Sequence, residues 1–273
     1  MNLSDQFAIC SWSLQPESPA ELAQKLRAIG ITRTQLAIDP IRAGGAWTDG
    51  FTKLGDLGVT IPSGMFAAVG EDYSTLDSIR RTGGIVPDAT WPATFANFKV
   101  MAPMARRADL THVMFHAGFL PHERHDPDYA KLAGRLTEVA DLFADHGLTC
   151  CLETGQEAAT SLRAFLEELN KPNVRVNFDP ANLILYDKGD PIAGLKTLLP
   201  HVVQCHIKDA TRTRTPGTWG EEVVVGTGEV DWPAFFATLG PTFSGTLALE
   251  REAGDQRVED LKTAHAFVRG IVK

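Results

Sequence analysis

The chain has 273 residues and a formal charge of −8, with 34 acidic against 26 basic residues. Proteins that bind nucleic acid concentrate Lys and Arg to displace counterions, so this balance argues against a DNA or RNA partner. The first residues show no signal-peptide pattern, and no segment approaches the roughly 20 apolar residues that span a bilayer. The four cysteines lack metal-type spacing. We therefore expect a cytoplasmic protein with reduced thiols and no membrane partner.

Short β-rich runs recur along the chain, and helical patterns with recognisable ends lie between them. In the first helical pattern, Ser18-Pro19 supplies an N-cap and a proline at the first helical position, and Gly30 closes the helix. A later pattern opens at Asp126-Pro127 and ends at Gly147. The expected strands cover residues 7–14, 32–38, 59–66, 112–118, 148–155, 174–180, 202–209 and 245–251.

The alternation of strands and helices predicts a parallel sheet, because strands joined by helices do not pair as hairpins. About eight such units without a long linker favour a closed barrel, which leaves no edge strand. We therefore expect one (β/α)8 TIM-barrel domain over residues 1–273. Residues 72–109 are expected to form a long insertion after the third strand and one wall of the barrel mouth.

Four polar residues stand near the ends of the last four expected strands. Alternate side chains of a barrel strand point into the barrel or out toward the helices. The apolar residues of these strands share the outward parity, and the polar residues share the inward parity. The polar set is Glu153, Asp179, His206 and Glu250. It lies at the C-terminal ends of the strands, where barrel enzymes place their chemistry.

Three carboxylates and an imidazole that converge in a barrel would repel one another without a compensating charge, and a divalent cation supplies it. Mn²⁺ is the ion we expect first, and the ligand types also suit Mg²⁺, Co²⁺, Zn²⁺ or Fe²⁺. Each residue alone has a structural alternative. Asp179 could cap a helix, Glu153 could bind an arginine, His206 could be a core histidine, and Glu250 could pair with Arg212 or Arg251. Four such coincidences on one face at one barrel end are less economical than one metal site.

Several stretches of the C-terminal half resemble the xylose-isomerase-like TIM-barrel family of sugar phosphate isomerases and epimerases. The family includes ketose 3-epimerases, inosose dehydratases and hydroxypyruvate isomerases. The resemblance implies that the four polar residues bind the metal, and that Glu153 and Glu250 also exchange protons with the substrate. The matching stretches are Cys-Leu-Glu-Thr (151–154), Asn-Phe-Asp-Pro-Ala-Asn (177–182), Cys-His-Ile-Lys-Asp (205–209), Val-Gly-Thr-Gly-Glu-Val-Asp-Trp (225–232) and Leu-Ala-Leu-Glu (247–250).

The resemblance also suggests substrate-binding residues. Arg212 stands six residues beyond His206, where the epimerases place a substrate-binding arginine, and Arg214 is close by. Asn182 replaces the epimerases' histidine three residues after the metal aspartate. Ala159 occupies the position of a second glutamate, with Glu157 nearby. These two differences weaken the specific assignment of free ketohexose epimerisation.

Four further features have both a functional and a structural interpretation. His116, at the end of the fourth strand, could bind substrate or act as a general acid, or it could cap the strand. Lys208 could contact substrate or face a helix carboxylate. The segment Gly226-Thr227-Gly228 could bind a phosphate or form a tight turn. The aromatic residues Trp12, Phe66 and Trp219 are candidate pocket walls or core residues.

The favoured function is a metal-dependent isomerase or epimerase that moves a proton next to the carbonyl of a sugar or keto-polyol through an enediolate. An inosose-type dehydratase on the same metal site is the alternative. An AP endonuclease of the endonuclease IV type is a remote alternative, because those enzymes bind three zinc ions with more histidines. A metal-containing binding protein without turnover is a further one. A homo-oligomer remains open.

Overall fold

The computed structural model describes residues 3–121, 123–215 and 217–272. Eight parallel strands close into a barrel in the order β1-β10-β7-β6-β5-β4-β3-β2, which confirms the predicted (β/α)8 fold. Every pairing around the ring is parallel. The barrel strands are β1 (Phe7–Cys10), β2 (Arg33–Ala37), β3 (Thr60–Met65), β4 (His112–Phe115), β5 (Thr149–Glu153), β6 (Val174–Phe178), β7 (Val202–Ile207) and β10 (Thr246–Leu249).

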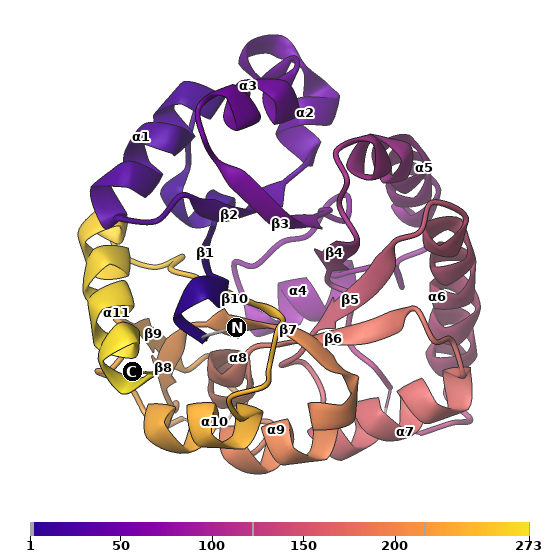
Figure 1. Ribbon diagram of the computed structural model, residues 1–273. Helices are drawn as coiled ribbons and strands as arrows, with labels where there is room; N and C mark the ends of the chain where they lie inside the picture. Colours follow the sequence, from indigo (N-terminus) through magenta and orange to yellow (C-terminus); the bar gives the residue numbers. More distant parts are fainter. Residues whose placement is uncertain (1–2, 122, 216, 273) are drawn as a thin grey trace.

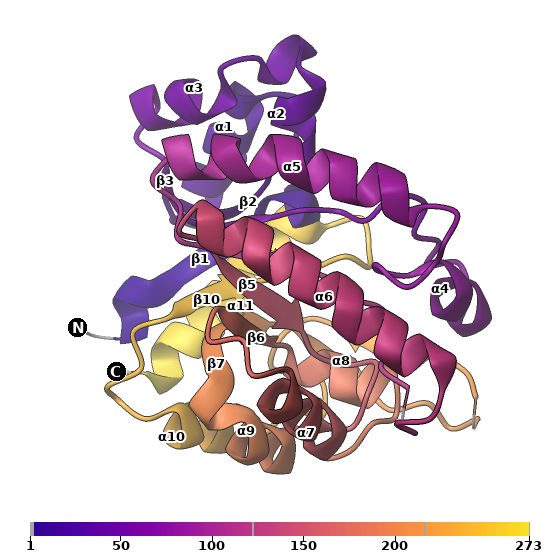
Figure 2. The same ribbon diagram turned by 90° about the vertical axis from the view of Figure 1, so that its right-hand side faces the viewer.

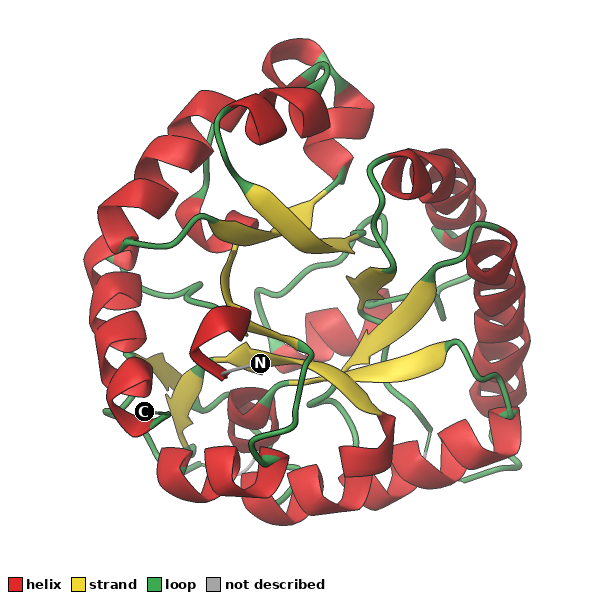
Figure 3. Ribbon diagram, viewed as in Figure 1, coloured by secondary structure: helices red, strands yellow, loops and turns green. Residues whose placement is uncertain are grey.

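Helices surround the strands as an outer ring (Figures 1 and 3). None of the helices within the described ranges is long and apolar enough to cross a bilayer. The helices are α1 (Pro19–Ile29), α2 (Asp39–Ala43), α3 (Gly50–Asp56), α4 (Leu76–Thr82), α5 (Trp91–Arg107), α6 (Pro127–Asp145), α7 (Ala159–Leu169), α8 (Pro180–Leu185), α9 (Pro191–Leu198), α10 (Trp232–Leu239) and α11 (Arg257–Ile271). Single 3₁₀ turns are η1 (Leu3–Gln6), η2 (Ser11–Leu14), η3 (Gly45–Trp47) and η4 (Leu199–His201).

The predicted helix ends agree with the local chemistry of the chain. The side chain of Ser18 accepts a hydrogen bond from the amide of Glu21, and Gly30 takes a left-handed φ of 87° at the end of α1. In α6, the Asp126 carboxylate accepts from the amide of Asp128 and caps the first turn. These capping bonds satisfy amides that have no partner inside the helix.

Two details differ from the sequence-based expectation. The first strand ends at Cys10, and residues 11–14 form η2 because the chain turns at Gln15, whose φ is 46°. A short antiparallel hairpin, β8 (Asp209–Thr211) with β9 (Glu221–Val223), follows β7 outside the barrel. The alternation of strands and helices could not predict this hairpin, because its strands have three residues each.

The strand parity is as predicted. The outward side chains Leu152, Phe178, Cys205 and Leu249 belong to the large apolar core between the strands and the helices. A second, small cluster of Ala8, Cys10 and Ala248 lies apart from this core, with Trp12 packed on it. Buried polar side chains such as Gln204 share the interior with this cluster, and the four polar residues of the predicted site lie at the strand ends.

The mouth of the barrel lies at the end opposite the chain termini. In Figure 2 the N-terminus and the C-terminus lie on one side, and α4 and α8 lie on the other. The predicted insertion 72–109 contains two helices, of which α4 lies at the mouth and α5 belongs to the outer ring. Glu71, Tyr73 and Ser74 in the segment before α4 line the cavity at this end, so this region forms a wall of the mouth.

Candidate active site

The four polar residues at the strand ends converge into one buried cluster. Glu153 is the last residue of β5, and Asp179 follows β6 and caps α8 by accepting the amide of Asn182 at 3.0 Å. His206 lies in β7, and Glu250 follows β10 directly. One potential ligand atom of each residue lies within 4.8 Å of those of the other three. The parallel strands bring these residues together because their C-terminal ends meet at the same rim.

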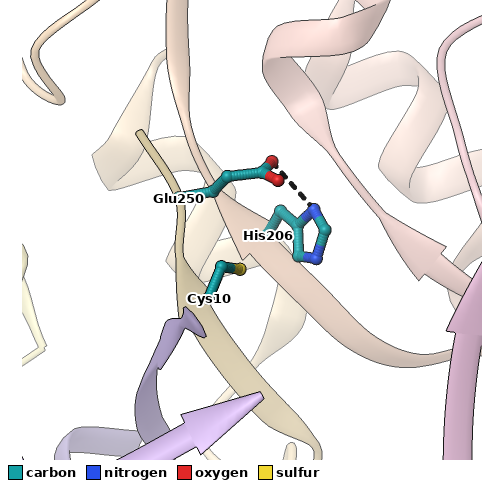
Figure 4. Close-up of side chains that lie close together, drawn as sticks. All are labelled: Cys10, His206 and Glu250. Atoms are coloured by element: carbon teal, nitrogen blue, oxygen red, sulfur yellow. Dashed lines mark ion pairs between the residues drawn. The ribbon is translucent and has the colours of Figure 1, made fainter. Parts of the chain in front are cut away.

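The two ring nitrogens of His206 have different partners. Nδ1 lies 2.8 Å from Glu153 Oε1 and 3.0 Å from Glu250 Oε2. Nε2 lies 2.8 Å from Gln35 Oε1. An amide oxygen only accepts, so Nε2 keeps its proton and Nδ1 is the nitrogen directed at the carboxylates. Figure 4 shows the Glu250 carboxylate pointing at the ring, with the Cys10 thiol near both.

Charge compensation inside the cluster comes from His206 and Lys208. Burial alone disfavours the imidazolium, but the Glu250 carboxylate and its neighbours raise the pKa of His206 well above its ordinary value. Burial likewise disfavours the Glu250 carboxylate, yet His206 and Lys208 lower its pKa to about 2. For Asp179, burial dominates and raises the pKa. The positive charges of His206 and Lys208 therefore hold the carboxylates together, and a metal ion between them would have the same effect.

Lys208 points into the cluster and is not an outward partner of a helix. Its Nζ lies 2.9 Å from Glu250 Oε2 and 3.0 Å from Asp179 Oδ2. It is two residues beyond His206 and therefore shares its inward parity. Despite this ion pair, Asp179 Oδ2 is fully buried and accepts no well-formed hydrogen bond from the described residues. An oxygen-rich set with one imidazole and one unsatisfied carboxylate oxygen fits a divalent metal ion.

A cavity of about 650 Å³ opens above the cluster. Its walls include the aromatic side chains Trp12, Phe66, Tyr73, Tyr186 and Trp219. The three aromatic residues expected as walls, Trp12, Phe66 and Trp219, all line it. Trp12 has a polar role as well, since its Nε1–H donates to Glu250 Oε1 at 2.6 Å. Trp12 thus holds one oxygen of the Glu250 carboxylate, and Lys208 holds the other.

His116 and Asn182 both contact Glu153. His116 Nε2 lies 2.6 Å from Glu153 Oε2. Burial opposes a charge on this ring, but the Glu153 carboxylate raises the pKa of His116 to about 9. Asn182 Nδ2 donates to Glu153 Oε1 at 3.2 Å and to the carbonyl of Thr154 at 3.1 Å. Gly155 permits this approach, since a Cβ there would stand 2.2 Å from the Cβ of Asn182.

Arg212 lies away from these residues. Its side chain is exposed, forms an ion pair with Asp187 and donates to the carbonyl of Gly189 at 3.4 Å. Its amide is bonded to Glu229, because β8 carries the chain away from the barrel axis after Asp209. Arg214 is also exposed, and neither arginine is among the residues that line the cavity. The structure does not bring the expected arginine to the site.

The residues at the site that were not predicted from the sequence include Gln35, Glu71, Tyr73, Glu222 and Glu252. A signal existed for Gln35, which is a polar residue at an inward position of β2. Glu252 follows Glu250 by two residues and could have been considered on that ground. Glu71, Tyr73 and Glu222 lie in loops or in the short hairpin, where sequence periodicity gives no direction for a side chain.

Known proteins share this architecture. A family model described as xylose isomerase-like TIM barrel matches residues 11–271. The structure of a xylose isomerase domain protein from Planctomyces limnophilus is 30% identical, covers 91% of each chain and has a TM-score of 0.83. An L-ribulose 3-epimerase shares the fold at 17% identity, with a TM-score of 0.74 over 97% of this chain and 94% of the other. The probable 3-DHS dehydratase AsbF from Bacillus anthracis shares it at 17% identity, with a TM-score of 0.70 over 97% and 98%.

A curated relative, the uncharacterized protein YihM of Escherichia coli, is 31% identical over 110 residues. This match covers 40% of the chain and spans a third of the relative, 33% of its length. The family model, in contrast, extends over nearly the whole chain and includes all four residues of the buried cluster. The protein therefore belongs to the xylose isomerase-like TIM-barrel family.

Proposed function

We propose that the protein is a metal-dependent isomerase or epimerase that transfers a proton next to the carbonyl of a sugar or keto-polyol. One observation carries the proposal: three carboxylates and an imidazole meet at the floor of a cavity large enough for a monosaccharide. The sugar epimerase among the proteins of similar fold supports the same chemistry.

The residues that would hold the ion are Glu153, Asp179, His206 and Glu250. A divalent ion in this position supplies Lewis acidity that stabilises negative charge developing beside a carbonyl. The oxygen-rich set suits Mn²⁺ first, with Mg²⁺, Co²⁺, Zn²⁺ or Fe²⁺ as alternatives. His206 would use Nδ1 for this purpose, since its Nε2–H is engaged by Gln35.

The proton transfer would use the two glutamates. Glu153 and Glu250 come from β5 and β10, which are separated around the barrel by β6 and β7. They can therefore approach a planar enediolate from different faces. His116 Nε2 lies 2.6 Å from Glu153 Oε2, and the raised pKa of His116 makes this ring the hydrogen-bond donor that orients the carboxylate. Return of the proton to the neighbouring carbon gives isomerisation, and return to the opposite face gives epimerisation.

Loss of a hydroxyl group from the same enediolate is the second candidate reaction. The similarity of fold to the dehydratase AsbF favours it, and it requires the same abstraction step. A DNA-repair role receives less support. Of the described histidines, only His116 and His206 belong to the cavity or the cluster, whereas a three-zinc centre uses more.

The proposal is tested with Glu153→Gln and Glu250→Gln, which keep the size of the side chain and remove its basic oxygen. We expect each change to lower kcat by about 100-fold or more and to change substrate binding less, because the base acts in the transition state. In deuterated water, the wild-type protein should place solvent deuterium on the carbon beside the carbonyl of an accepted ketose or inosose. Partial labelling is expected, since a shielded glutamate can return the same proton.

The matched control is Glu138→Gln on the outer face of α6, where the side chain is exposed and far from the mouth. This change should leave kcat and labelling intact. Full turnover by both active-site variants, with no label in the product, would eliminate the two-glutamate mechanism. Hydride-shift isomerisation would give unlabelled product but would still depend on the metal.

A further inference from the structure

The cavity carries far more negative than positive side chains. Five glutamates line it: Glu71, Glu153, Glu222, Glu250 and Glu252. Among the described lining residues Lys208 is the one lysine, and no arginine is present. Asp179 lies beneath the same floor. His116 also lines the cavity, and its raised pKa makes it a second positive group beside Lys208. These two side chains and a divalent ion together carry fewer charges than the six carboxylates, and one carboxylate stays in excess even if Glu222 is counted as neutralised.

The positive groups near the cavity are already committed. Lys208 Nζ is bonded to Glu250 and paired with Asp179, and it lies 3.8 Å from Glu252 Oε2. His116 Nε2 is paired with Glu153 Oε2 at 2.6 Å. Arg251 holds Glu222 at 3.0 Å and Asp260 at 2.9 Å, and it is not a lining residue. An anionic group of a substrate would therefore have to compete with a protein carboxylate for each of them.

The glycine segment after β9, which could have bound a phosphate, is also engaged. The buried Asp209 carboxylate accepts from the amides of Gly226, Gly228 and Val230 at 2.9 to 3.2 Å. It accepts from Trp232 Nε1 at 3.0 Å and from the amide of Ala210 at 2.9 Å. Gly228 is required by this packing, since a Cβ there would stand 2.2 Å from Asp209 Oδ1. A carboxylate of the protein itself thus occupies the donors that a phosphate would need.

We infer that the cavity selects an uncharged polyhydroxy carbonyl compound and discriminates against its phosphate ester and against carboxylate analogues. The excess of carboxylates repels an anion in a site of low dielectric constant. The aromatic walls formed by Trp12, Tyr73 and Trp219 suit the C–H faces of a neutral sugar ring. The inference rests on the proposed function and specifies its substrate class.

The test compares free sugars with their phosphate esters on the metal-loaded protein. The probes are D-fructose with D-fructose 6-phosphate, and L-ribulose with its 5-phosphate, and the readout is solvent-deuterium exchange. We expect kcat/KM to be at least about tenfold lower for the ester of an accepted sugar. The double change Glu71→Gln with Glu252→Gln should reduce this ratio several-fold, whereas Glu138→Gln should leave it unchanged. An ester that exchanges as fast as its free sugar, or faster, overturns the inference.

A second readout does not depend on catalysis. Trp219 lines the cavity, and its fluorescence is the part of the wild-type emission that is lost in the Trp219→Phe variant. This emission can be quenched with iodide or with caesium, and each quencher is calibrated on free N-acetyltryptophanamide. We expect caesium to be the better quencher after calibration. Equal or better quenching by iodide overturns the inference about charge. Preferred quenching by caesium, with no exchange of any sugar, supports the charge selection and counts against the proposed proton transfer instead.

Discussion

Gln35 determines which nitrogen of His206 faces the carboxylates. Its Oε1 accepts from Nε2 at 2.8 Å and also accepts a weak bond from the Cys10 thiol at 3.5 Å. Residues that hold the second nitrogen of a metal-binding histidine typically contribute a factor of 10 to 100 in affinity. Gln35 is therefore a positioning residue, which acts on the ion through His206.

Replacing Gln35 by Leu should weaken binding of Mn²⁺ or Zn²⁺ by about tenfold or more, because it leaves the Nε2–H buried without a partner. The measurement is a metal titration followed by calorimetry. The matched control is Gln204→Leu, which changes another buried glutamine of the barrel interior, two residues before His206. Both polar side-chain atoms of Gln204 lack a partner among the described residues, so its loss should not affect the metal. Similar losses in the two variants would contradict the assigned role of Gln35.

At the scale of elements, the rim of the barrel depends on Asp209. This residue begins β8, and four of its five hydrogen bonds connect the end of β7 to residues 226–232, including the start of α10. Its side chain is fully buried, and so are Ala210, Val230 and Trp232 among its donors. The segment between β9 and α10 therefore depends on one carboxylate for its position.

Asp209→Ala should lower the free energy of unfolding by about 3 kcal/mol or more, since it leaves several buried donors unpaired. Asp231→Ala is the control. Asp231 caps α10 through one hydrogen bond to the amide of Ala234 at 3.0 Å, and its loss should cost about 1 kcal/mol. Urea unfolding followed by circular dichroism gives both values. Equal destabilisation would show that Asp209 does not organise the segment.

The whole molecule should respond to the metal through linked stability. An ion that binds the folded protein at a concentration 100-fold above its Kd adds about 2.7 kcal/mol to the free energy of unfolding. For a domain of this size, that corresponds to a rise in Tm of about 5 to 10 °C. Chelation should remove the rise and abolish activity, and metal analysis should find about one divalent ion per chain.

Two neighbouring residues of β7 provide variants for the same measurement. His206→Ala should eliminate the metal-dependent rise in Tm. Cys205→Ala should lower the baseline Tm through lost packing and keep the rise, because this side chain faces the helices. Loss of the rise in both variants would place the ion elsewhere in the barrel. A metal-free protein with full activity would refute the proposed dependence on metal.

The sequence alone was sufficient for the barrel and for the convergence of Glu153, Asp179, His206 and Glu250. Strand parity and the alternation of strands and helices repeat over a few residues, and parallel strands bring their ends to one rim regardless of the loops. The helix starts at Ser18 and Asp126 could also be predicted from the local sequence, because each capping side chain bonds to an amide within three residues.

Other features were decided only by the tertiary structure. The spacing from His206 predicted that Arg212 lies in the site. In the structure, the hairpin β8–β9 turns the chain away, and Arg212 forms an ion pair with Asp187. Gly226 and Gly228 are compatible with either a phosphate or a turn until Asp209, about 20 residues earlier, is seen to occupy their amides. The charge of the cavity likewise depends on Glu71, which a loop brings to the mouth. Contacts between segments distant in the chain depend on the path of the loops, and local periodicity contains no information about that path.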